Sequence, residues 1–114
     1  MPEHRRAKND LPPGTLEMLV LKALSIEPMH GYGIAQHIKR VSAAVLRVEE
    51  GSLYPALQRL LIKGLVKAEW GQSDNNRRAR YYRLTPAGRT QLGHEEAGFT
   101  AVFEAIQRVM RADA

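Results

Sequence analysis

The 114-residue chain contains no cysteine, one tryptophan, two phenylalanines and no long hydrophobic run. Without cysteine, the protein has neither a disulfide framework nor a thiolate metal site. None of its apolar stretches approaches the roughly 20 residues that a membrane-spanning helix requires. The charged start MPEHRR is not followed by the apolar core of a secretory signal. These absences together predict a protein of the cytoplasm that does not use the membrane.

The sequence also lacks a catalytic or metal-binding constellation. It has no phosphate-binding glycine loop and no nucleophile motif. None of its four histidines has a His, Asp or Glu three or four residues further on, the spacing that a zinc-binding helix requires. We therefore predict a protein that is not an enzyme and holds no metal and no cofactor.

Positive charge is present and is concentrated in one segment. The formal net charge of the chain is +5, and residues 71–89 hold five arginines against a single aspartate. A basic segment of this kind favours a polyanionic partner, either nucleic acid or an anionic membrane surface. At this length, with 44% hydrophobic residues, the chain is large enough for one modest core.

Three short helices are expected before the basic segment, over residues 16–25, 32–41 and 52–64. Thr15 is the predicted N-cap of the first, and apolar residues recur along it at helical spacing. They are Leu16, Leu19, Val20, Ala23 and Leu24. The pattern in residues 42–51 leaves open whether this connector is a short strand or an extension of the second helix.

The third helix carries an apolar stripe of Leu53, Leu57, Leu60 and Leu61. Pro55 is expected in its first turn, where a missing N–H breaks no helical hydrogen bond. Gly64 is the predicted stop, because glycine readily takes the left-handed conformation that ends helices.

Two alternating segments follow, at residues 65–70 and 79–84, and they predict an antiparallel hairpin with a polar, basic tip. Thr85 and Pro86 then form a typical helix start, with a capping side chain followed by proline. The last helix should continue to about Arg111.

This order of elements predicts a mainly α protein with a small β-hairpin, a winged helix-turn-helix followed by a long C-terminal dimerisation helix. We divide the chain into a flexible N-terminal arm (1–13), a winged helix-turn-helix DNA-binding domain (14–85) and the dimerisation helix (86–114).

Duplex DNA is the predicted partner, since helix-turn-helix proteins lay the start of their second helix in the major groove. Gln58 and Arg59 are the candidates for base edges, while Ser52 and Tyr54 suit phosphate oxygens. Tyr54 could instead be a core aromatic, and the arginines of the hairpin could be an ordinary solvated tip. The DNA-binding candidates are Tyr32, Gln36, Lys39, Ser52, Tyr54, Gln58, Arg59, Lys63, Arg77, Arg78 and Arg80.

The last helix carries an apolar stripe that calls for a partner, and a second copy of the chain supplies a self-complementary one. A two-fold dimer would engage two half-sites of a pseudo-palindromic operator. The candidates for this homodimer contact are Leu92, Phe99, Val102, Phe103, Ile106, Val109 and Met110.

Four motifs of the chain resemble those of the PadR family of bacterial transcriptional regulators, in particular its short subfamily. They are GTLEMLVLKAL, HGYGIAQHI, GSLYPALQRLLIKGLVKAEW and RRARYYRLTPAGRTQL, within residues 14–111. The resemblance implies a homodimeric repressor of nearby genes, which a small aromatic or cationic effector could release from DNA. It also implies that the match to GSLYPAL begins the recognition helix at Ser52.

One departure from the family pattern concerns the effector. Many members carry a tryptophan in the middle of the last helix, where this chain has Phe99, the candidate residue for an effector pocket. Two other functions compete with the repressor: a small-molecule sensor whose DNA binding is secondary, and a winged-helix module that binds RNA or another protein.

Overall fold

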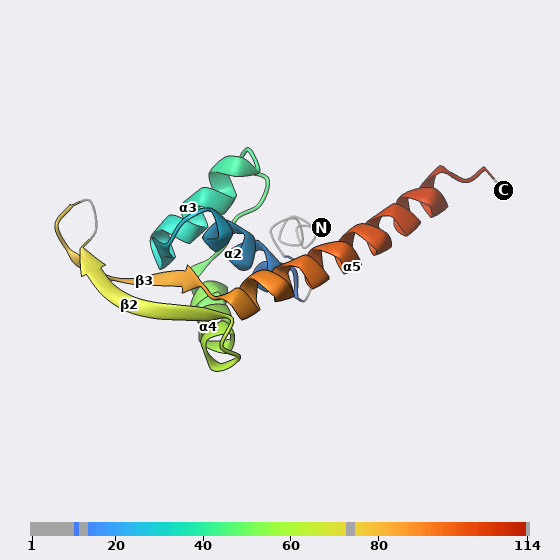
Figure 1. Cartoon of the computed structure of the whole chain (residues 1–114). Helices are drawn as coiled ribbons and strands as arrows, with labels where there is room; N and C mark the ends of the chain where they lie inside the picture. Colours follow the sequence, from blue (N-terminus) through green and yellow to red (C-terminus); the bar gives the residue numbers. More distant parts are fainter. Residues whose placement is uncertain (1–10, 12–13, 73–74, 114) are drawn as a thin grey trace.

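A computed structural model describes residue 11, residues 14–72 and residues 75–113 (Figure 1). The predicted arm, residues 1–13, lies outside the described residues except for residue 11. The helices are α2 (Thr15–Ile26), α3 (Gly31–Val41), α4 (Glu50–Ile62) and α5 (Pro86–Arg111). The strands are β1 (Met29–His30), β2 (Val66–Gln72) and β3 (Arg78–Leu84).

Helix α2 is the centre of the fold and packs against α3, α4, α5 and β3. A helix with neighbours on several sides buries more than one stripe. Leu21 lies outside the predicted apolar stripe and is nevertheless fully buried, whereas Leu16 and Leu19 are only partly buried. The remaining core comes from the inner faces of α3 and α4, the base of the hairpin and Leu92 of α5.

Two helix starts differ from the predictions. Gly14, in the left-handed conformation at φ 84°, occupies the N-cap of α2, and the predicted cap Thr15 is the first helical residue. Helix α4 begins at Glu50, two residues early, which places Pro55 in the second turn. Its missing N–H therefore leaves the carbonyl of Gly51 without the usual helical partner.

The predicted stop at Gly64 is confirmed. Lys63 caps α4, and Gly64 follows with a φ of +75°. The Gly64 N–H donates to the Leu61 carbonyl, and the next N–H donates to the Leu60 carbonyl, so the last turn keeps its hydrogen bonds.

The connector between α3 and α4 is neither of the two alternatives left open above. Ala43 and Ala44 both take positive φ values, 55° and 66°, which end α3 in a series of turns. The N–H of Ala44 donates to the carbonyl of Lys39 at 2.7 Å, and this bond closes the helix end.

The sheet has the order β1-β3-β2 and is antiparallel throughout. The two-residue strand β1 was not predicted, because a strand that short has no period of its own. Tyr82 is buried in the middle strand, with Ala68 and Met29 as its partners on either side. The result is the mainly α, winged helix-turn-helix fold that the sequence predicts, with a third strand added at the base of the wing.

Helix α5 starts on the body of the molecule and then leaves it (Figure 1). As predicted, Thr85 caps the helix, and its hydroxyl accepts a hydrogen bond from the Gly88 N–H at 3.0 Å. Figure 1 shows the wing and the far end of α5 pointing in opposite directions, which gives the molecule its extents of 58 × 36 × 22 Å.

Candidate nucleic-acid interface

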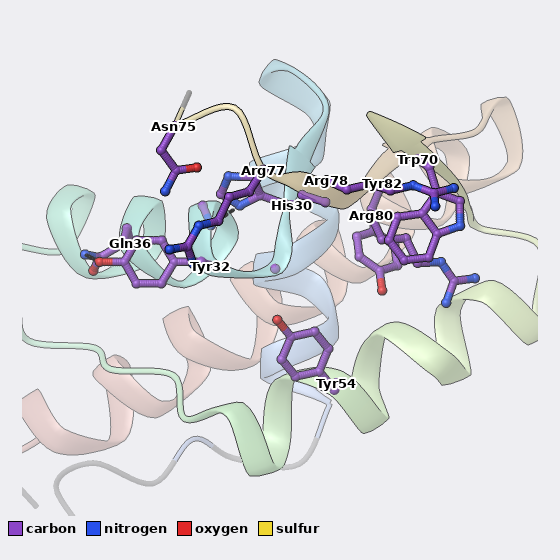
Figure 2. A pocket seen from close by; sticks show the side chains of 13 residues that line it. His30, Tyr32, Gln36, Tyr54, Trp70, Asn75, Arg77, Arg78, Arg80 and Tyr82 are labelled. Atoms are coloured by element: carbon purple, nitrogen blue, oxygen red, sulfur yellow. Dashed lines mark hydrogen bonds between the residues drawn. The ribbon is translucent and has the colours of Figure 1, made fainter. Parts of the chain in front are cut away.

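A hollow of about 760 Å³ separates the wing from the first turns of α3 and α4 (Figure 2). Its walls are aromatic and basic, from three separate parts of the chain. His30 and Tyr32 come from the start of α3, Tyr54 from α4, and Trp70, Arg78 and Arg80 from the wing. We call this hollow the wing groove.

His30 shapes the α3 side of the wing groove. Its Nδ1 accepts a hydrogen bond from the Gly33 N–H at 2.9 Å and caps α3. Because Nδ1 accepts, the proton of the neutral ring lies on Nε2, which makes Nε2 a donor. The ring also contacts Tyr81, with 5.2 Å between ring centroids.

The three predicted contacts on α3 lie along its exposed side. The Gln36 amide donates to the Tyr32 hydroxyl at 2.8 Å, so these two side chains hold each other in place. Lys39 is exposed one helical turn further on. All three project into solvent, as residues that reach a DNA backbone must.

Tyr54 is neither fully buried nor free. Its ring packs on Gly31 so closely that a Cβ at this glycine would lie 2.5 Å from the tyrosine oxygen. The side chain nevertheless remains 45% exposed. Burial raises the pKa of the Tyr54 hydroxyl, and the charges of Glu50 and Tyr82 raise it further. The hydroxyl therefore stays protonated at neutral pH and is available as a donor to phosphate.

The predicted contacts of α4 divide between two flanks of the helix. Tyr54 and Gln58 are four residues apart and share one flank of the helix, on which Tyr54 lines the wing groove. Ser52 and Arg59 share the other flank, seven residues apart, with Lys63 one turn beyond. All five side chains belong to exposed residues.

Arg59 and Lys63 are held toward α2 by a single carboxylate. Arg59 Nε lies 2.6 Å from Glu17 Oε2, and Lys63 Nζ lies 3.4 Å from Glu17 Oε1. Burial alone would raise the pKa of Glu17, but the Arg59 hydrogen bond and the Lys63 charge outweigh it and lower the pKa. Arg59 would have to leave this ion pair to read a base, a requirement that the sequence pattern does not reveal.

The wing presents different side chains on its two faces. Trp70 lies opposite Arg80 in the ladder, and this pair continues the face that is buried at Tyr82. The guanidinium of Arg78 lies 4.6 Å from the centroid of the Trp70 ring, and that of Arg80 lies 5.8 Å from the Tyr82 ring. The other face carries an ion pair, in which Arg83 Nη2 lies 2.9 Å from a carboxylate oxygen of Glu69.

Arg77 lines the wing groove beside Asn75 at the wing tip (Figure 2). The structure thus brings Arg77, Arg78 and Arg80 together with Tyr54 across one hollow. Trp70 also lines it, and the sequence-based candidates did not include this residue. An exposed tryptophan that alternates with charged residues in a strand beside a basic segment is the signal that would have identified it.

The predicted dimerisation residues divide into one core residue and six exposed ones. Leu92 is only 8% exposed and belongs to the core of its own chain, so its prediction is corrected: the side chain anchors α5 on α2 and the body. Phe99 and Phe103 stack at 5.9 Å with nearly parallel rings. The exposed residues are Phe99, Val102, Phe103, Ile106, Val109 and Met110. Along the described chain, no helix, including α5, combines the length and apolarity needed to cross a bilayer.

Comparison with solved structures confirms the fold. A PadR family transcriptional regulator from Eggerthella lenta is 30% identical and superimposes with a TM-score of 0.75, over 97% of this chain and 88% of that one. A transcriptional regulator from Clostridium thermocellum has a TM-score of 0.76 at 25% identity, over 83% of this chain and 92% of that one.

Sequence comparison leads to the same family. A transcriptional regulator of Mycobacterium tuberculosis is 42% identical over 64 residues, which are 56% of each protein. The model of the transcriptional regulator PadR-like family matches residues 20–94, from the second half of α2 to the first third of α5. PadR-like regulators bind DNA and are not enzymes, as the sequence predicts for this chain. The chain therefore belongs to the PadR-like family of transcriptional regulators.

Proposed function

We propose that this regulator is a homodimeric repressor that binds a pseudo-palindromic operator near the genes it controls in the cytoplasm. Each subunit contacts one half-site with its wing groove and its α4 helix. The observation that carries the proposal is the apolar face of α5, where six large side chains are 45–77% exposed beyond the point at which the helix leaves the body.

A face of this size is costly in water and is typical of an interaction site. Phe99, Phe103 and Ile106 recur at helical spacing, so they lie in one line along the helix. A second α5 helix offers the same line of side chains, and a two-fold pair buries both. Twenty-six residues of α-helix extend about 39 Å, long enough to separate two DNA-binding bodies by about one turn of DNA.

The dimer is tested by analytical ultracentrifugation of Phe103→Glu. A carboxylate in the middle of an apolar interface is desolvated without a partner, so the dissociation constant of the dimer should rise by at least about a hundredfold. Ala101→Glu is the matched control, because it adds the same charge on the opposite, exposed side of α5. A wild-type protein that sediments as a monomer at high concentration contradicts the proposed dimer.

Repression is tested with DNA from the chain's own promoter region. Fluorescence anisotropy should show a strong preference for this duplex over a scrambled one, with an affinity that falls steeply as salt rises. Run-off transcription from the same promoter should decrease when the protein is added. Increased transcription would identify an activator, and equal weak binding to both duplexes would leave only nonspecific electrostatic attraction.

Release by a small effector is a second part of the proposal, and the stacked rings of Phe99 and Phe103 support it. In the proposed dimer these nearly parallel rings near the middle of α5 would lie at the interface, where a planar aromatic or cationic compound could stack on them. Calorimetric titration with planar aromatic cations and neutral planar aromatics tests this. Saturable heat that is lost in Phe99→Ala supports the effector site, and heat that is unchanged in this variant contradicts it.

A further inference from the structure

The wing of this protein carries an exposed aromatic ring with a guanidinium stacked on it, and neither side chain belongs to the core. Trp70 is 60% exposed and lies outside the core cluster. Its ladder position follows the last pair that packs on the core, Ala68 and Tyr82, on the same face of the sheet. The core face of the hairpin therefore continues past the body as a solvent-facing strip that begins at Trp70.

The stacked guanidinium lies over the ring and pairs with no acid among the described residues. Arg78 sits 4.6 Å from the Trp70 centroid, diagonally across the two strands. None of the ion pairs between described residues involves Arg78 or Arg80. The acid nearest in the ladder, Glu69, is on the opposite face and pairs with Arg83. The strip thus offers positive charge to an outside partner beside a flat apolar surface.

We propose that Trp70 is an uncharged DNA contact of the wing, which packs against the sugar wall of the minor groove while Arg78 contacts the adjacent phosphate. This inference rests on the proposed DNA-binding function and adds a residue and a contact type to it. The minor groove suits this strip because its walls are deoxyribose faces, which are apolar, between rows of phosphates, which are anionic. A surface that only approached phosphates would gain nothing from an exposed indole.

The arrangement also separates two sources of affinity that are usually mixed. Arg78 acts through its charge, so its contribution to binding must fall as salt rises. Trp70 releases no counterion, so its contribution must persist at every salt concentration. The two side chains are in contact on one strip, so the salt dependence of binding by each variant separates their contributions.

Fluorescence anisotropy on a duplex from the chain's own promoter region, across a salt series, tests the proposal. Trp70→Ala should weaken binding by about tenfold at each salt concentration and leave the slope of log affinity against log salt unchanged. Trp70→Phe should recover most of the loss. Arg78→Ala should reduce the slope by about one. Val45→Ala, which shortens another exposed apolar side chain away from the groove, should bind as the wild type does.

A second measurement needs no variant, because Trp70 is the chain's one tryptophan. Saturating duplex should protect its fluorescence from quenching by acrylamide. Unchanged quenching, or a Trp70→Ala protein that binds as tightly as the wild type, overturns the proposal while the DNA-binding function stands. A wild-type protein that binds no duplex overturns both. Circular dichroism of each variant confirms that the exposed substitution leaves the fold intact.

Discussion

The two halves of α5 have similar apolar spacing and opposite surroundings. In the first half, Thr85 caps the helix, Gly88 lies against the backbone of Leu65, and Leu92 is buried in the core. In the second half, Phe99 and Phe103 stack on each other in solvent. One continuous helix is therefore a core element at its start and a free surface towards its end.

This contrast teaches that an apolar stripe identifies a face to be buried but not the molecule that buries it. The same periodicity led to Leu92 and Phe103 being grouped together as dimer contacts. The body of the chain covers Leu92, because α2 lies beside the start of α5. Beyond that contact the described chain provides little cover, and the remaining stripe is the face that we propose a second copy covers.

The largest expected effect comes from truncating the buried anchor. Leu92→Ala should lower the free energy of unfolding by about 3 kcal/mol, because it leaves a cavity in the core. Phe103→Ala is the matched substitution in the exposed half and should change only the part of the stability that depends on protein concentration. Urea denaturation at two protein concentrations measures both. If the two variants lost the same free energy of unfolding at both protein concentrations, the two halves of α5 would not differ in this way.

A smaller effect should follow from adding one methyl group in each half. A Cβ on Gly88 would lie 2.1 Å from the Leu65 carbonyl oxygen, so Gly88→Ala should destabilise the protein by about 2 kcal/mol. A Cβ on Gly98 meets no described atom within 4 Å, so Gly98→Ala should stabilise α5 by about 0.5–1 kcal/mol. Thermal melts followed by circular dichroism would show opposite shifts, and shifts of the same sign would contradict the comparison.

The helix cap should matter somewhat less. Thr85 Oγ1 accepts from the Gly88 N–H and donates to the Gly64 carbonyl at 2.8 Å, so it joins α5 to the end of α4. Thr85→Ala should cost about 1–2 kcal/mol. Thr90→Ala, which removes an exposed hydroxyl bonded only to the carbonyl one turn back, should cost less than about 0.5 kcal/mol. Guanidinium denaturation distinguishes the two, and equal costs would show that the cap contributes nothing.

The smallest expected effect is a pH-dependent change in stability from the Glu17 carboxylate, which lies in the body of the molecule and not in α5. The pKa of Glu17 is lowered in the folded state, so its contribution is present above the ordinary pKa of 4.5 and is lost as pH falls through the folded value. Glu17→Gln should therefore cost less than about 1 kcal/mol at neutral pH, and the cost should be smaller near pH 3. Urea denaturation at both pH values measures this, with Glu27→Gln as an exposed control. A loss that persists at low pH would assign the effect to packing.

Much of the body was predictable because its signals are local. Alternation of apolar residues indicates strands, helical spacing indicates helices, and Thr85, Pro86 and Gly64 mark helix ends through backbone chemistry that needs no distant partner. Boundaries that depend on contacts were less accurate. The early start of α4 moved Pro55 into the second turn, and β1 exists only because β3 provides its hydrogen-bond partner.

The candidate site was predictable in composition but not in arrangement. The cluster of arginines and the amphipathic α4 indicated a DNA-binding surface. The pairing of Arg59 with Glu17, 42 residues apart, is a tertiary contact that no local pattern contains. The same holds for Tyr54, whose place in the wing groove depends on Gly31 leaving room for its ring.

The amino-acid sequence by itself determined the order of elements, the basic wing and the family, because these follow from residue type and spacing along the chain. Tertiary structure alone decided which flank of α4 opens into the wing groove, which basic side chains are held by Glu17, and where along α5 the core ends. The reason is physical: the spacing of residues along the chain places each side chain on one face of its helix or strand. Burial and ion pairing depend on which other parts of the chain pack against that face.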